Sequence, residues 1–230
     1  LNVDPVNPNQ ASVGNKLSTI ELFSSGGLLE NHRVNIIYNA MMMQHLSSSL
    51  LNFAEGDKYI WREDYASALF IQYRQSVKLI EDLLVQLDAE AAPDEMKAIV
   101  RILRIFVFHR LTDHYGDIPY SEAGKAFIDL IYAPKYDAQS DIYLDMLEEL
   151  EAAAAILSLD SGTSAFGSAD FLFQGDLIKW KKFANSMMLR LGFRLIKVDP
   201  ATAKSWVTKA ISGGVMPVSY THLTLPTKWT

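Results

Sequence analysis

Residues 97–123 read KAIVRILRIFVFHRLTDHYGDIPYSEA, a strongly periodic stretch that ends abruptly in a Gly-Asp-Ile-Pro turn. Its apolar side chains recur at the i, i+3, i+4, i+7 spacing of one buried helical face. They are Met96, Ile99, Val100, Leu103, Phe106, Val107 and Leu111. Ile105 and Phe108 widen this face, which predicts a helix covered on more than one side, at the centre of an all-α body. Gly116 can take the left-handed conformation that ends a helix, and Pro119 prevents Ile118 from continuing it.

The basic residues of this helix lie largely outside the apolar face, and we expect them to stay in water. They are Lys97, Arg101, Arg104 and Arg110. Asp113 and Asp117, near its end, are expected to make local turn and helix-end hydrogen bonds.

The rest of the chain predicts further helices joined as hairpins. The expected helices cover 17–23, 28–51, 65–90, 93–115, 139–159, 176–198 and 200–211, with irregular loops at 52–64 and 121–137. Ser140–Asp141 and Asp176 are expected N-terminal caps, because their side chains can accept hydrogen bonds from a helix's first amides. The interior face of the 28–51 helix is expected to hold Ile36, Ile37, Ala40, Met41, Met43 and Leu46.

Composition excludes several classes of protein. The 230 residues are 49% hydrophobic and 21% charged, which suits a globular fold with a core. A formal net charge of −6 argues against nucleic-acid binding through bulk positive charge. No uninterrupted apolar run approaches the ~18 residues needed to span a bilayer, so no transmembrane helix is predicted. The absence of cysteine excludes disulfides and thiolate metal sites.

Four segments resemble the SusD/RagB family, the nutrient-binding lipoproteins of the Bacteroidetes outer membrane. They are LNVDPVNPN at the start of the chain, LTDHYGDIPYSEA (111–123), YDAQSDIYLDMLEELEAAAAIL (136–157) and DFLFQGDLIKWKKFANSMMLRLGFRLIKVDP (170–200). They occur in the family's order and span roughly residues 1–215. The resemblance implies an all-α fold of tetratricopeptide-like helical hairpins with long irregular loops. It also implies that Trp180, within the last segment, belongs to the core.

The resemblance also bears on domain organisation. Family members are commonly about twice this length, so residues 1–217 are expected to be a truncated SusD-like domain. Residues 218–230 contain SYTHLTLPT, which resembles translated adapter read-through, and we expect this tail to be non-native. The chain starts at Leu1 without a signal-peptide pattern, so we expect any signal peptide to have been removed. The family places a lipid-carrying Cys upstream of such a start.

Metal binding and catalysis find little support in the sequence. His109, Asp113, His114 and Asp117 cluster, but a metal site needs three or four converging ligands, and His114 is expected to point elsewhere. No Ser/His/Asp or Glu/His spacing is specific enough for catalysis, and no pair of carboxylates stands out as facing across a cleft. The acidic run at 148–151 is typical of a solvated helix face. The sequence therefore predicts no enzyme, no metal and no cofactor.

Aromatic side chains in loops are the better candidates, because sugar rings stack their C–H faces on exposed Trp or Tyr. The candidate ligand-binding residues are Tyr59, Trp61, Tyr120, Tyr132 and Tyr136. The alternative for each of them is packing as a loop anchor.

The resemblance implies non-catalytic capture of an oligosaccharide or polysaccharide by a cell-surface lipoprotein of the outer membrane. It also implies delivery to a SusC-like TonB-dependent transporter. Three alternatives stay open: a peptide-binding protein of the RagB type, a helical-repeat scaffold for protein interaction, and a glycosidase.

Overall fold

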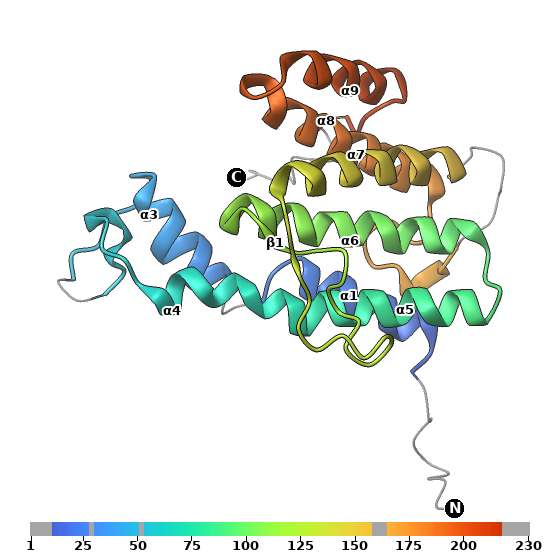
Figure 1. Cartoon of the computed structure of the whole chain (residues 1–230), viewed down its shortest axis with the longest axis horizontal. Helices are drawn as coiled ribbons and strands as arrows, with labels where there is room; N and C mark the ends of the chain where they lie inside the picture. The colour runs from blue at the N-terminus through green and yellow to red at the C-terminus, as the bar shows by residue number, and fades with distance from the viewer. Residues whose placement is uncertain (1–10, 28–29, 51–52, 158–164, 218–230) are drawn as a thin grey trace, which may run out of the picture.

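The computed structural model describes residues 11–27, 30–50, 53–157 and 165–217, and Figure 1 shows their helices stacked in successive layers. The α-helices are α1 (Val13–Ser24), α3 (Ala40–Met42), α4 (Glu63–Ala66), α5 (Lys78–Ala89), α6 (Asp94–Tyr115), α7 (Gln139–Ile156), α8 (Leu177–Arg194) and α9 (Pro200–Ser212). Shorter or differently wound helices are η1 (Asn31–Asn39), η2 (Glu55–Lys58), η3 (Ser67–Ile71), η4 (Tyr73–Val77), η5 (Gly167–Ala169) and η6 (Leu195–Lys197). Two short strands, β1 (Ile118–Pro119) and β2 (Tyr136–Asp137), pair antiparallel at the two ends of a long loop.

The layers follow the order of the chain. Helix α5 packs on α6, α6 on α7, α7 on α8 and α8 on α9, while α1 packs against α5 and α6. The connections from α5 to α6 and from α8 to α9 reverse the chain, so each of these pairs forms an antiparallel hairpin, whereas α4 continues through η3 and η4 into α5 in one direction (Figure 1). The predicted all-α fold of helical hairpins is confirmed. Within the described ranges, no helix combines the length and apolar character needed to cross a membrane.

Helix α6 lies at the centre of these layers, as its wide apolar face predicts. Ile99, Leu103, Ile105 and Phe108 are buried in the main hydrophobic cluster. Trp180 of α8 is fully buried in the same cluster, and its indole N–H donates to Asp170 Oδ2 over 2.7 Å. The expectation that Trp180 belongs to the core is therefore confirmed.

Two of the basic residues of α6 differ from the prediction that they stay in water. The Arg104 side chain is only 11% exposed and pairs with Glu81 and Glu149. Arg110 pairs with the buried Glu30 and donates to the Ser24 carbonyl. The prediction was wrong for these two arginines because carboxylates from other elements meet them within the layers.

The predicted helix over 28–51 is also partly wrong. A π-helix, η1, replaces its first part, and helical structure ends near Met43, after which Gln44 has φ +59°. Ile37 and Met41 are buried as expected, whereas Ile36, Met43 and Leu46 are exposed. The i→i+5 winding of a π-helix changes which side chains share a face, so the period of 3.6 residues no longer applies.

The N-terminal caps of α7 and α8 were both predicted from nearby residues, and one of the two predictions is correct. Asp176 accepts a hydrogen bond from the Lys179 amide over 3.1 Å, as predicted. The predicted capping of α7 by Ser140–Asp141 is wrong, because Asp117 Oδ1 accepts from the Gln139 amide over 2.9 Å. Asp117 therefore makes a helix-end hydrogen bond, as predicted, but at the start of α7 and not at the end of α6.

A buried pair of acidic residues joins α1 to the segment before α8. The Asp170 carboxylate accepts hydrogen bonds from the amides of Leu172, Phe173 and Gly175. Glu21 accepts one from the Phe171 amide over 2.7 Å. Burial of Glu21, together with the adjacent Asp170, raises its pKa from 4.5 to about 8, so Glu21 is protonated at neutral pH.

We therefore expect Glu21→Gln to change the pH dependence of stability. Because the pKa of Glu21 is higher in the folded chain, its stabilising contribution is complete below pH 4.5 and is lost as the pH rises toward 8. Through this window the wild-type free energy of unfolding should fall relative to that of Glu21→Gln, by at most about 1.4 kcal/mol per pH unit. Urea unfolding followed by circular dichroism at several pH values measures this difference. The exposed Glu148→Gln is the control, and parallel curves for all three proteins would contradict the expectation.

Candidate functional site

The segment between α3 and α4 carries two of the candidate aromatic residues and is firmly anchored. The Asp57 carboxylate accepts a hydrogen bond from the Ser48 amide over 3.0 Å. Gly56 packs against η1 so closely that a Cβ there would lie 2.6 Å from the Tyr38 carbonyl oxygen. Only glycine allows this approach without a shift of the backbone. These two contacts anchor the turn at residues 55–58 to Ser48 and to η1.

Tyr59 follows this turn in the left-handed conformation, with φ +55° and ψ +28°. Its amide donates to the Gly56 carbonyl over 3.0 Å. A non-glycine residue in this conformation costs about 1–2 kcal/mol, and the Tyr59 side chain is exposed and recovers little of it through burial. Such strain persists only where the surroundings impose it, and it is concentrated at functional sites.

Trp61, two residues further on, lines an open pocket together with Arg62, Glu63, Asp64 and Ser67. Arg62 is held in place by ion pairs with Glu55 (2.8 Å) and Asp64 (3.3 Å). An exposed indole ring thus lies beside a fixed guanidinium and two carboxylates. An apolar face with convergent polar groups is the usual make-up of a small-molecule site. We call this surface, formed by Tyr59 and the residues of the pocket, the Trp61 surface.

Tyr132 lies on a different loop, between β1 and β2, and Tyr136 stands in β2 at the end of that loop. This loop packs against η4 and α5, since Gly124 lies against Val77 and the Lys78 ammonium is 4.6 Å from the centre of the Phe127 ring. In Figure 1 it leaves α6 near β1, well away from the α3–α4 end of the molecule. Tyr59, Trp61, Tyr132 and Tyr136 are between 66% and 74% exposed. The structure therefore presents the four aromatics as two separate pairs.

Tyr120 differs from the other four candidates. It is only 4% exposed, and its hydroxyl donates to Asp145 over 2.5 Å. Its ring lies between the Phe108 ring, with centres 4.8 Å apart, and the Arg104 guanidinium, 4.4 Å from the ring centre. Because these contacts cover its ring, Tyr120 cannot offer a stacking face, and we leave it out of the candidate surface.

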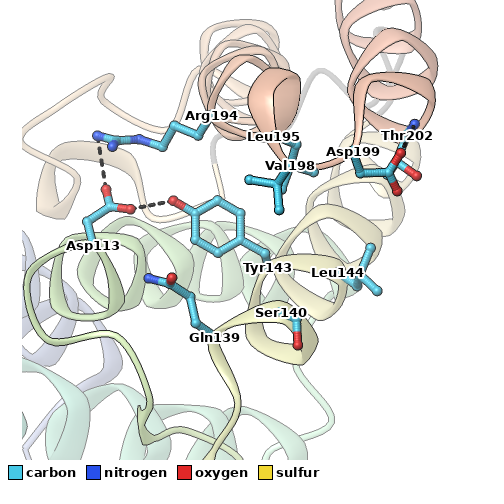
Figure 2. A pocket seen from close by; sticks show the side chains of 10 residues that line it. All are labelled: Asp113, Gln139, Ser140, Tyr143, Leu144, Arg194, Leu195, Val198, Asp199 and Thr202. Carbon is cyan, nitrogen blue, oxygen red and sulfur yellow. Dashed lines mark hydrogen bonds and ion pairs between the residues drawn. The ribbon is translucent and has the colours of Figure 1, made fainter.

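A pocket of about 490 Å³ lies where the ends of α6 and α8 meet α7 and α9 (Figure 2). Asp113 accepts a hydrogen bond from the Tyr143 hydroxyl and pairs with Arg194 over 3.0 Å. Exposed apolar side chains, Leu144 and Val198, line its other part. This pocket was not predicted from the sequence, because its residues come from α6, α7, α8, η6, α9 and the turn before α9 and share no local pattern. The contacts of Asp113 with Tyr143 and Arg194 are long-range, so the prediction that Asp113 makes local hydrogen bonds is wrong.

The residues considered for metal binding or catalysis serve structural contacts. His109 Nδ1 lies 3.3 Å from the Ile105 carbonyl oxygen, and His114 Nε2 lies 3.2 Å from that of Ala66. Within the part of the chain that the structure describes, no three His, Asp or Glu side chains converge as a metal site would require. The close carboxyl pair, Glu21 of α1 and Asp170 before α8, is buried and accepts hydrogen bonds from the amides of residues 171–175.

A model of the SusD-like family, described as "Starch-binding associating with outer membrane", matches residues 8–227. Because this match covers nearly the whole sequence, the chain belongs to the SusD-like family. No match was found among curated protein sequences.

Solved structures give the same assignment. A chitin-binding protein is 36% identical with a TM-score of 0.80, over 90% of this chain and 44% of that protein. A chitin-binding SusD homologue from Flavobacterium johnsoniae is 32% identical with a TM-score of 0.58, over 68% of this chain and 32% of that one. A SusD homologue from Parabacteroides distasonis shares the fold, with 24% identity and a TM-score of 0.73. The match covers 88% of this chain and 39% of that homologue. The chain thus spans less than half the length of these relatives.

The strain at Tyr59 can be measured with Tyr59→Gly. Glycine adopts positive φ at no steric cost, although it loses more chain entropy on folding. We expect Tyr59→Gly to be more stable than wild type by roughly 0.5–1 kcal/mol, because relief of strain outweighs the added entropy loss. Chemical denaturation measures the difference. Tyr132→Gly is the control, since φ of Tyr132 is not positive, and it should be destabilised. Equal destabilisation of both variants would contradict the interpretation of Tyr59.

Proposed function

We propose that this chain is part of a protein that captures glycans without chemical change at the surface of the outer membrane. The observation that carries the proposal is the Trp61 surface. It presents an exposed indole, a strained and exposed tyrosine, and fixed charged groups at the edge of an open pocket. Membership of a family described as starch-binding, and likeness to proteins named as chitin-binding, support a glycan as the ligand.

The chemistry of a glycan suits this surface. A pyranose ring has an apolar C–H face that can lie against the indole of Trp61, and its hydroxyl groups can donate to carboxylates or accept from a guanidinium. Arg62 is already held by Glu55 and Asp64, so its donors lose little freedom when a ligand binds. The Trp61 surface therefore supplies both stacking and hydrogen bonding. Tyr132 and Tyr136 are a second place where the same ligand could stack.

The proposal predicts that Trp61→Ala weakens binding of chitooligosaccharides at least tenfold. Loss of the indole removes the stacking face, and tenfold corresponds to about 1.4 kcal/mol. Isothermal titration calorimetry with the wild-type chain and the variant measures the change. Phe171→Ala, which removes an equally exposed aromatic ring from another segment, is the matched control. Equal affinities of all three proteins would exclude Trp61 from the site. Binding of peptides in place of glycans would favour a RagB-like function.

We also propose that the whole protein is a lipoprotein that passes its ligand to a SusC-like TonB-dependent transporter, with no nucleic acid involved. The support is the outer-membrane association in the description of the family. We expect an affinity-tagged full-length protein to co-purify from detergent-solubilised outer membranes with one TonB-dependent transporter. Mass spectrometry identifies the partner. Co-purification with no transporter, while glycan binding persists, would refute delivery and leave capture standing.

A further inference from the structure

A second pocket, of about 390 Å³, lies between the π-helix η1 and the helices α6 and α8. Its polar lining comes from η1, α6 and α8. It consists of Asn35, Asn39, His109, Arg110, Asp113, His114, Arg190 and Arg194. A π-helix of nine residues is rare, and π-helical winding occurs frequently at functional sites. Here the winding places Asn35 and Asn39 in the wall of one pocket. We call it the Arg190 pocket.

The charges of this pocket do not balance. Buried Glu30 neutralises Arg110. Asp113 neutralises Arg194 over 3.0 Å, in the ion pair drawn in Figure 2. Arg190 has neither a hydrogen bond nor an ion pair with any residue that the structure describes, and its side chain is exposed. Asp113 also interacts electrostatically with Arg190, at longer range than with Arg194. Three guanidinium groups thus share two carboxylates, Glu30 and Asp113, which leaves an excess of one positive charge at this pocket.

The other groups in the lining add no negative charge. Burial, together with nearby Arg190, lowers the pKa of His109 to about 4, so its ring is neutral at pH 7. No hydrogen bond within the described ranges engages the side-chain amide of Asn39. Asn35 donates from its amide to Asn31 Oδ1 over 2.9 Å, which leaves its own carbonyl oxygen as an acceptor. A cation with neutral donors and acceptors nearby matches a ligand that carries one negative group and several hydroxyls.

We propose that the Arg190 pocket binds an acidic sugar, with the carboxylate on Arg190 and hydroxyl groups on Asn35 and Asn39. A guanidinium presents two parallel N–H donors that fit the two oxygens of a carboxylate. The part that concerns the sugar depends on the proposed glycan-binding function, whereas the anion site depends only on the lining. If both hold, this protein takes a glycan with neutral and acidic units.

The test is calorimetric titration of the chain at low ionic strength with methyl β-D-glucuronide, methyl β-D-glucoside and sodium sulfate. We expect the glucuronide to bind at least tenfold more tightly than either of the other two, and added potassium chloride to weaken it. Arg190→Gln should weaken binding of the glucuronide at least tenfold, because it removes the excess positive charge and the guanidinium donors. Arg74→Gln, at an exposed arginine of η4 that forms no ion pair with any residue in the described ranges, should leave glucuronide binding unchanged.

Asn39→Ala is the second variant, which tests the pocket without altering its charge and should weaken the glucuronide but not sulfate. Chitooligosaccharide binding is measured on the same samples and should be unaffected by Arg190→Gln. Equal affinity for glucuronide and glucoside, or an Arg190→Gln variant that binds like wild type, would overturn the proposal. If sulfate binds as tightly as the glucuronide, the pocket is a general anion site, and the proposal that it recognises a sugar is wrong. A wild-type chain that binds the glucuronide but no chitooligosaccharide would refute glycan capture at the Trp61 surface and leave the Arg190 pocket standing.

Discussion

The buried guanidinium of Arg104 is the contact on which the layered arrangement depends. It pairs with Glu81 of α5 over 2.8 Å and with Glu149 of α7 over 3.3 Å, so one side chain of α6 connects three layers. It also donates to the Tyr120 carbonyl over 3.2 Å and lies against the Tyr120 ring. Removing one partner of a buried ion pair leaves an uncompensated charge and costs about 3–5 kcal/mol. The apolar face of α6 contributes many side chains to the hydrophobic core. The contacts of Arg104 set how α5, α7 and the loop after β1 are positioned against α6.

Arg104 lies at one end of the loop between β1 and β2, while Phe127 and Tyr132, inside the same loop, are exposed. The Asp137 carboxylate accepts hydrogen bonds from the amides of Tyr120 and Ser121, which closes the loop beside the paired strands. Tyr120 is drawn into the core as part of this closure. Tyr132, farther from both ends, stays in solvent. Two tyrosines of the same loop therefore differ in what they can do, because only one of them lies beside Arg104.

The sequence predicted the parts of the structure that local patterns control. The period of apolar residues located α6. The capping side chain of Asp176, which marked the start of α8, accepts from the amide of Lys179, only three residues away. Asp117 caps a helix 22 residues away, and no local pattern reveals such a partner. The aromatic residues of the loops could be named in advance, but whether each is exposed depends on tertiary contacts, as Tyr120 shows. The Arg190 pocket could not be predicted, since it combines a π-helix with two helices distant in sequence.

The π-helix η1 connects the two candidate sites physically. On one side, Gly56 packs closely against the Tyr38 carbonyl, and this contact positions the turn that leads to Tyr59 and Trp61. On the other side, Asn35 and Asn39 line the Arg190 pocket. An ordinary α-helix over the same residues would turn these side chains to other directions, because its hydrogen bonds close after four residues and not five. The unusual winding of this one helix is therefore the common requirement of both surfaces, and a change that restores α-helical winding in η1 would alter both at once.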